Sequence, residues 1–298
     1  MTTAEPLLAV KNLTVRFRGE RGTEVVAVND VSFEIGKGEA LAVVGESGSG
    51  KSVTALSLTR LVPEPPAIID SGEILFEGRD LLQLRERELR KVRGAKVAYI
   101  FQEPSTSLNP VFTIRGQIAE AIRLHRPEVK NVDEEIIRWL YQVGIVEPEK
   151  RMRDYPHQLS GGMQQRAMIA MALCCHANLL VADEPTTALD VTIQAQIIDL
   201  LAELKAKLDM SILLITHNFG IIRGLADKVA VMFRGRIVEY GETESVLRSP
   251  SHPYTRALID CIPRIGGHVD RLPVIDYDGL AADAGPMKAA NPTTTTDS

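Results

Sequence analysis

The sequence has few cysteines, no long apolar run and no excess of positive charge, and each shortage excludes a class of protein. Its three cysteines, Cys174, Cys175 and Cys261, form neither a disulfide framework nor a Cys-x-x-Cys metal site. We interpret them as reduced thiols. No segment approaches the roughly 20 consecutive apolar residues of a membrane-spanning helix, and the N-terminus lacks the pattern of a secretory signal. We expect a chain that does not cross a membrane by itself.

The charge balance argues against a general attraction to nucleic acid. The net charge is −5, whereas such attraction depends on an excess of lysine and arginine. The 298 residues are 45% hydrophobic and 24% charged, which is ordinary for a globular protein. We therefore expect one large domain or two modest ones, and no nucleic acid among the partners.

The order of the apolar patterns predicts an α/β fold. The first forty residues alternate as strands do, and "ALAVVG" is apolar on both faces, like a central strand of a parallel sheet. It leads into residues 51–62, whose spacing is helical. From residue 178 onward strands and helices alternate again, which favours a parallel sheet. Between these parts, residues 103–171 are mostly helical, and we interpret them as a helical subdomain inserted into the sheet domain.

A shift in composition divides the chain near Pro250. Beyond it the sequence is rich in Pro, Gly, Ala and Thr and ends in "GPMKAANPTTTTDS". Its last twenty or so residues include too few large apolar groups to fold alone. We assign residues 1–250 to a nucleotide-binding domain and residues 251–298 to a C-terminal extension that ends in a mobile tail.

A complete phosphate-binding motif follows the predicted central strand. "GESGSGKS" satisfies the pattern G-x-x-x-x-G-K-[ST]. Its glycines let backbone N–H groups turn toward a triphosphate, while Lys51 brings a positive charge to the outer phosphates and Ser52 offers a hydroxyl ligand to Mg²⁺. We predict that ATP is bound by the loop and the residue after it, namely Gly45, Glu46, Ser47, Gly48, Ser49, Gly50, Lys51, Ser52 and Val53.

Two other glycine-rich motifs are excluded by single positions. A dinucleotide fingerprint counted from Gly48 needs glycine where Val53 stands. A hydrolase nucleophile elbow counted from Gly45 needs glycine where Ser49 stands. The loop therefore favours a triphosphate over either alternative.

Other polar residues stand at or near the ends of predicted strands, and the carboxyl ends of parallel strands share one edge of a sheet. "NLLVADEP" ends in Asp183, a candidate to hold Mg²⁺ through water, and Glu184, a candidate to orient and deprotonate the attacking water. His217 ends "SILLITH" and either reaches the γ-phosphate or is only a satisfied polar residue. Gln102 ends "VAYIFQ" and could touch Mg²⁺ or the water. Phe17 either stacks on adenine or belongs to the core.

A second phosphate-binding pattern lies in "LSGGMQQR", residues 159–166. Ser160, Gly161 and Gly162 offer a hydroxyl and unobstructed N–H groups at the start of a predicted helix, where the helix dipole favours an anion. The whole helical insertion separates this turn from Lys51. It is badly placed to serve the same nucleotide, so we expect it to serve the nucleotide of another subunit in a head-to-tail pair.

Taken together, these motifs resemble those of ATP-binding cassette (ABC) ATPases. "GESGSGKS", Gln102, "LSGGMQQR", "LLVADEP", "TALD" with Asp190, and His217 stand in the order of the P-loop, Q-loop, signature, Walker B, D-loop and switch histidine. The resemblance implies a P-loop NTPase (RecA-like) sheet with an N-terminal antiparallel β-subdomain. It also implies that the signature and D-loop contact the partner's ATP through Ser160, Gly161, Gly162, Gln164 and Asp190, and that Ser52, Gln102 and Asp183 serve Mg²⁺.

Further segments look like the ATPase subunits of bacterial oligopeptide and dipeptide importers, a group that also serves opines, nickel and glutathione. They include "IFQEPSTSLNP" and "SPSHPYTRAL". This resemblance implies a subunit on the cytoplasmic side of the bacterial inner membrane. Its partners would be a second cassette, identical or a sister, two transmembrane permease subunits and a separate solute-binding protein.

Two departures and one alternative qualify this interpretation. Many relatives have a Cys-rich segment after "RLP", but "RLPVIDYDGLAADAGP" has no cysteine, so we expect no iron-sulfur cluster. Asn218 replaces the more usual aspartate after the switch histidine. The alternative function is that of a soluble ABC ATPase acting on nucleic acid or ribosomes, although the chain lacks the duplicated cassette, coiled coil or zinc-binding cysteines typical of that class.

Overall fold

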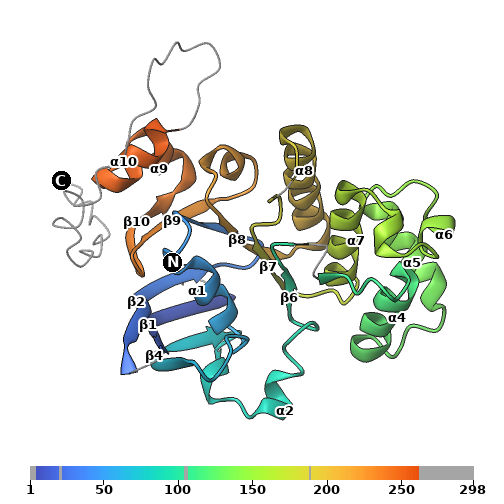
Figure 1. Cartoon of the computed structure of the whole chain (residues 1–298), viewed down its shortest axis with the longest axis horizontal. Coiled ribbons are helices and arrows are strands. Elements are labelled where there is room, and N and C mark those ends of the chain that lie inside the picture. Colours follow the sequence, from blue (N-terminus) through green and yellow to red (C-terminus); the bar gives the residue numbers. More distant parts are fainter. Residues whose placement is uncertain (1–4, 20–21, 104–106, 188, 262–298) are drawn as a thin grey trace, which may run out of the picture.

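Two β-sheets and a group of helices form the protein, as seen in a computed structural model (Figure 1). The structure describes residues 5–19, 22–103, 107–187 and 189–261. The predicted mobile tail and the cysteine-free segment after "RLP" lie outside the described residues. Within these ranges, no helix combines the length and the apolar character needed to cross a bilayer.

The larger sheet is the predicted parallel sheet. Its strand order is β10-β9-β3-β8-β7-β6, and every neighbouring pair is parallel except the antiparallel pair β9 and β10 at one edge. The strands are β3 (Ala40–Val44), β6 (Val97–Ile100), β7 (Leu179–Asp183), β8 (Ser211–Thr216), β9 (Lys228–Phe233) and β10 (Arg236–Glu242).

Both faces of the parallel sheet are buried, which explains why its central strand β3 is apolar at every position. Because successive side chains in a strand point to opposite faces, Leu41 and Val43 of β3 join one apolar core. Ala40, Ala42 and Val44 join the other core. Two-sided burial of this kind is the rule for parallel strands.

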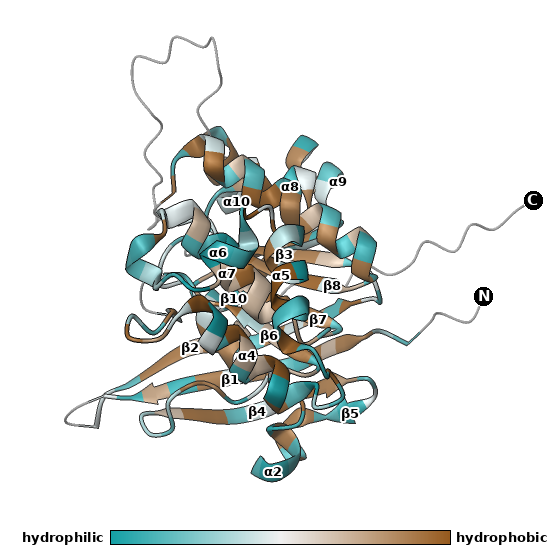
Figure 2. Ribbon diagram, turned by 90° about the vertical axis from the view of Figure 1, so that its right-hand side faces the viewer, coloured by the Kyte–Doolittle hydropathy of each residue, from teal (hydrophilic) through white to brown (hydrophobic). Residues whose placement is uncertain are grey.

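The first of these cores is closed by a smaller antiparallel sheet with the order β2-β1-β4-β5. In Figure 2, β1 and β4 form a separate layer below the parallel sheet. Ala55 of helix α1 and Leu58, which directly follows this helix, belong to the same core. These elements are β1 (Leu8–Arg18), β2 (Glu24–Ile35), β4 (Ala67–Phe76), β5 (Arg79–Asp80) and α1 (Lys51–Ser57).

The second core lies between the parallel sheet and most of the remaining helices. Trp139, 1% exposed, is the bulkiest fully buried side chain on this side. The helices are α2 (Glu86–Leu89), α4 (Ile114–His125), α5 (Val132–Gln142), α6 (Pro148–Arg151), α7 (Gly161–Leu173), α8 (Val191–Leu208), α9 (Thr243–Arg248) and α10 (Pro253–Asp260). The 3₁₀ segments are η2 (Leu81–Gln83), η3 (Pro156–Gln158) and η4 (Phe219–Gly224).

The predicted fold class is confirmed: a parallel α/β core carries an antiparallel β-subdomain and a helical insertion. Helices α4 to α7 fall within or at the end of the predicted insertion. Our division of the chain at residue 250 remains a prediction.

Candidate nucleotide-binding site

The glycine-rich loop follows β3 and winds tightly against neighbouring backbone. A side chain at Gly45 would collide with the carbonyl oxygen of Met232, and one at Gly50 would collide with the carbonyl oxygen of Ala27. Gly50 also has a φ of 103°, in the left-handed region that side chains disfavour. Only glycine therefore fits at these two positions, and the loop can curl back before α1 begins at Lys51.

The Lys51 side chain is hydrogen-bonded to the backbone of this loop. Its Nζ donates to the carbonyl oxygens of Gly45, at 2.8 Å, and of Glu46, at 2.7 Å, and the residue is 4% exposed. Burial lowers the pKa of Lys51, although the carboxylates of Glu184, Asp183 and Glu46 oppose this shift. A buried ammonium gains from a nearby anion, so a phosphate group would stabilise its charged form.

Ser52 and Asp183 place two oxygen atoms side by side at the end of β7. Ser52 Oγ donates to Asp183 Oδ1 at 3.0 Å. Burial raises the pKa of Asp183, and the neighbouring Glu184 carboxylate acts in the same direction. Mg²⁺ binds oxygen ligands at about 2.0–2.1 Å in an octahedron, which requires about 2.9 Å between adjacent ligands. The two oxygens therefore fit a magnesium ion that also binds water and phosphate.

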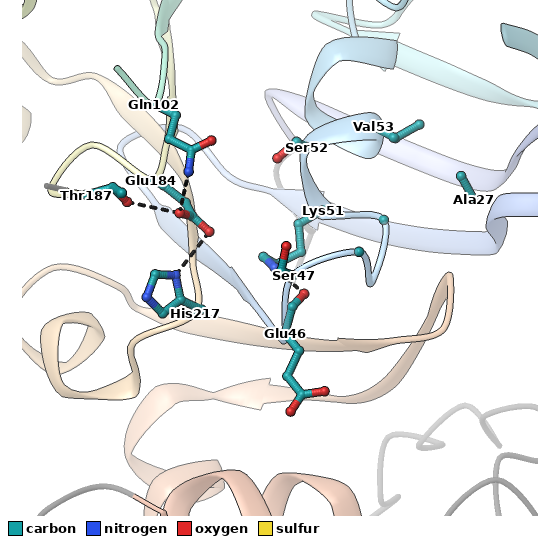
Figure 3. A pocket seen from close by; sticks show the side chains of 12 residues that line it. Ala27, Glu46, Ser47, Lys51, Ser52, Val53, Gln102, Glu184, Thr187 and His217 are labelled. Carbon is teal, nitrogen blue, oxygen red and sulfur yellow. Dashed lines mark hydrogen bonds and ion pairs between the residues drawn. The ribbon is translucent and has the colours of Figure 1, made fainter. Parts of the chain in front are cut away.

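Glu184 is the most heavily hydrogen-bonded side chain of the site. Its carboxylate contacts His217 Nδ1 at 3.1 Å and accepts from Thr187 Oγ1 at 2.9 Å and Gln102 Nε2 at 3.1 Å (Figure 3). Its backbone has a φ of 47°, in the left-handed region, a conformation that often marks functional positions.

These contacts keep Glu184 ionised. Burial acts to raise the pKa of Glu184, but the hydrogen bonds from His217 and Thr187 and the charge of Lys51 hold it below its usual value. A carboxylate that is charged at neutral pH and points toward a phosphate loop can orient a water and accept its proton.

The strand ends enclose a cavity of about 760 Å³, a volume typical of small-molecule sites. Seven of the predicted ATP-binding positions line it, together with Gln102, Glu184 and His217, so the structure brings the predicted residues together. Sequence reasoning missed two lining residues, Ala27 and Thr187. The lining residues are Ala27, Glu46, Ser47, Gly48, Gly50, Lys51, Ser52, Val53, Gln102, Glu184, Thr187 and His217.

Phe17 does not line this cavity. It lies in β1 opposite Val25 and is partly buried against the core between the two sheets. Packing in the core is therefore enough to explain why a phenylalanine stands at this position. Its contact with adenine remains a prediction.

The turn with Ser160, Gly161 and Gly162 lies apart from the P-loop. Figure 1 shows α1 and α7 on opposite sides of strands β6 and β7, and the cavity around Lys51 includes no residue of this turn. Ser160 is exposed and caps the start of α7, where its Oγ accepts from the N–H of Met163 at 3.4 Å. Within one chain the Ser160 turn and the P-loop therefore do not share a cavity.

Gln164 is hydrogen-bonded to its own loop. Its Nε2 donates to the carbonyl oxygens of Pro156 at 2.9 Å and Leu159 at 3.2 Å. These acceptors stand eight and five positions earlier in the chain. The side chain thus fixes the turn that precedes α7, while its contact with a partner's nucleotide remains a prediction.

The same arrangement occurs at two other helix starts. Gln194 donates to Thr186 and Leu189 before α8, where Asp190 accepts from the N–H of Ile193 at 2.9 Å. Gln117 donates to Asn109 and Phe112 before α4. We call Gln117, Gln164 and Gln194 the loop-fixing glutamines. Each follows a helix-capping residue by four positions.

The fold and the site together define a P-loop nucleotide-binding protein. Residues 28–187 match the ABC transporter family, and residues 238–286 match the oligopeptide/dipeptide transporter C-terminal region. The chain therefore belongs to the ABC transporter family of ATP-binding proteins.

Curated relatives resemble most of this chain. The peptidoglycan transport ATP-binding protein YejF of Agrobacterium fabrum is 54% identical over 88% of the chain, which spans only 48% of that relative. The dipeptide transport ATP-binding protein DppD of Bacillus subtilis is 47% identical over 91% of the chain and 81% of that relative. The chain thus spans about half of the first relative and about four-fifths of the second.

Solved structures of cassettes share the fold. The dimeric bacterial ABC transporter cassette MJ0796 superposes with a TM-score of 0.70 and 25% identity, over 79% of this chain and 98% of the other. A second structure of MJ0796, a post-hydrolysis dimer bound to ADP and Pi, gives the same TM-score, identity and coverage.

Proposed function

We propose that this chain is the ATP-binding and ATP-hydrolysing subunit of an ABC importer for peptides or related small solutes, such as opines, nickel or glutathione. The observation that carries the proposal is the cluster around Glu184, in which a charged carboxylate, His217 and Gln102 face the loop that holds Lys51. The names of the relatives, which include peptide, dipeptide and oligopeptide transport proteins, support the class of solute.

In this proposal the P-loop binds the triphosphate of ATP. Lys51 exchanges its carbonyl partners for phosphate oxygens, since an anionic oxygen attracts the ammonium group more strongly than a neutral carbonyl oxygen does. Ser52 and Asp183 would hold Mg²⁺, which supplies charge neutralisation at the phosphates when bound. Glu184 orients the attacking water and accepts its proton, and His217 steadies the Glu184 carboxylate.

A second cassette completes the site. In a head-to-tail pair, the partner's Ser160 and the partner's Gly162 donate to the γ-phosphate that lies on Lys51. The separation of the two phosphate-binding patterns within one chain supports this arrangement, and MJ0796 forms a dimer. Closure excludes bulk water from the site, and loss of the γ-phosphate removes the contacts that favour closure.

The remaining partners follow from the family. We infer two transmembrane permease subunits, a solute-binding protein, and a peripheral position on the cytoplasmic side of the bacterial inner membrane. The C-terminal region shared with oligopeptide/dipeptide transporters favours an importer over a soluble ATPase that acts on nucleic acid or ribosomes.

The variant Glu184→Gln tests the assignment of the base. It keeps the size of the side chain but removes its charge, so ATP binding should persist while turnover falls by about 100-fold or more, the usual contribution of a positioned base. Because the γ-phosphate persists, dimers should accumulate with ATP on gel filtration. Glu203→Gln is the matched control, since Glu203 is exposed and, among the residues that the structure describes, forms an ion pair with Lys207 alone. Turnover near the parental rate in Glu184→Gln would refute the assignment.

A transport experiment tests the class of solute. In vesicles that contain the purified complex, a binding protein loaded with peptide should stimulate ATP hydrolysis and the uptake of labelled peptide. Stimulation by ribosomes or RNA, with no response to the loaded binding protein, would favour the alternative function.

A further inference from the structure

Helix α10 contacts the phosphate-binding loop through a buried tyrosine. Tyr254 has no exposed surface, and its hydroxyl accepts a hydrogen bond from the backbone N–H of Glu46 at 3.2 Å. The two residues are separated by 208 positions in the chain. The region that resembles the C-terminal part of oligopeptide/dipeptide transporters therefore reaches the first residues of the P-loop.

Two further contacts hold this tyrosine in place. Its ring lies 4.3 Å from that of Phe233, centroid to centroid, and Phe233 follows Met232, whose carbonyl oxygen abuts Gly45. The start of α10 is anchored by Glu239, which is 8% exposed and accepts from the N–H groups of Ser251 at 2.6 Å and His252 at 3.1 Å. The contacts of Phe233 and Glu239 thus fix the position of the Tyr254 hydroxyl next to the loop.

The hydrogen bond acts on one particular peptide group. The carbonyl oxygen of Gly45 and the N–H of Glu46 belong to the same planar unit. Lys51 Nζ donates to that carbonyl oxygen at 2.8 Å, while Tyr254 accepts from the N–H on the opposite side. The peptide group is therefore held from both sides, and its orientation determines where Lys51 finds its partner.

We propose that Tyr254 is a positioning residue for ATP binding, by which the C-terminal region sets the shape of the P-loop and the placement of Lys51. This inference rests on the proposed function, because it concerns the same nucleotide site. Tyr254 does not line the cavity, so it acts through the Gly45–Glu46 peptide group and not by touching the nucleotide.

The variant Tyr254→Phe tests the proposal, because it removes the hydroxyl and keeps the ring against Phe233. Loss of one hydrogen bond corresponds to about a 3- to 10-fold weaker Kd, measured with a fluorescent ATP analogue on the full-length chain. The KM for ATP should rise by a similar factor while kcat stays within about 2-fold, since Glu184 and His217 are untouched. Amide hydrogen exchange of residues 45–50 should become faster without nucleotide.

Tyr240→Phe is the matched control. Its hydroxyl donates to the carbonyl oxygen of Glu34 at 3.3 Å, in β2 and away from the loop. The proposal is overturned if Tyr254→Phe binds nucleotide as the parental chain does, if exchange of residues 45–50 is unchanged, or if Tyr240→Phe weakens binding equally. Failure of the parental chain to bind ATP would instead refute the proposed function, so the two failures are distinguishable.

Discussion

Replacement of the loop-fixing glutamine Gln164 by alanine should weaken ATP-dependent pairing of two cassettes without weakening ATP binding at the P-loop. Its amide makes two hydrogen bonds, to Pro156 at 2.9 Å and Leu159 at 3.2 Å, and each is worth about 0.5–1.5 kcal/mol. The single chain can relax and hydrate the freed carbonyl groups, whereas the dimer requires the Ser160 turn in its native shape. Much of the loss should therefore appear in the dimerisation free energy.

The magnitude follows from those two bonds. A loss of about 1–3 kcal/mol corresponds to roughly a 5- to 140-fold weaker dimer, since about 1.4 kcal/mol is tenfold. The assay is sedimentation velocity with ATP in the Glu184→Gln background, where hydrolysis does not reverse closure. Binding of the fluorescent ATP analogue to the single chain should change by less than about 2-fold, because Gln164 bonds to Pro156 and Leu159 and not to the P-loop, and none of these three residues lines the cavity.

Gln117→Ala is the matched control for this prediction. It removes two hydrogen bonds of the same kind, at 3.1 Å each, from the loop before α4, together with a third in which Gln117 Oε1 accepts from the N–H of Asn109 at 2.8 Å. Its cost to stability should therefore be at least as large, at about 2–4 °C in Tm for each kcal/mol. It should leave dimerisation of the isolated chain unchanged. Equal weakening of the dimer by both variants, or by neither, would refute the reasoning.

The remaining predictions concern Glu135, which is 11% exposed and accepts from Arg126 Nη1 and Arg138 Nη2, each at 2.6 Å, and from Trp139 Nε1 at 3.0 Å. Glu135→Gln should lower the free energy of unfolding by about 2 kcal/mol at neutral pH, measured with urea; a change below about 0.5 kcal/mol would contradict this. Burial acts to raise the pKa of Glu135, but Arg126 and Trp139 hold it below its usual value. A depressed pKa stabilises the fold above the unfolded-state pKa, so the difference between variant and parent should shrink as pH falls through the folded-state pKa. A difference that grows on acidification would refute the pairing.

Local sequence patterns predict the end of a helix where a capping residue stands there. Within the part of the chain where strands and helices were expected to alternate, α8 has clear ends, because Asp190 caps its start and Asp209, with a φ of 50°, ends it. The helical spacing of residues 51–62 extends beyond α1, which ends at Ser57. Arg60, with a φ of 51°, lies outside helical geometry. Periodicity alone does not mark such an end.

Contacts across the fold were less accessible to sequence reasoning. The P-loop, Glu184, His217 and Gln102 could be predicted because strand ends of a parallel sheet share an edge. The hydrogen bond from Glu46 to Tyr254 could not, since it joins segments 208 positions apart and depends on where α10 packs. The role of Gln164 was also not predicted. Its side chain bonds to the preceding loop, and the motif "LSGGMQQR" does not reveal these contacts.

The central claim is that a nucleotide on one chain is enclosed by the Ser160 turn of another. A photoreactive ATP analogue with its reactive group on the γ-phosphate tests this in a mixture of parental chain and a tagged Lys51→Ala chain, which cannot hold the phosphates itself. We predict labelling of residues 160–162 in the tagged chain only when parental chain is present. Labelling of residues 160–162 within the single chain that holds the analogue would contradict the account.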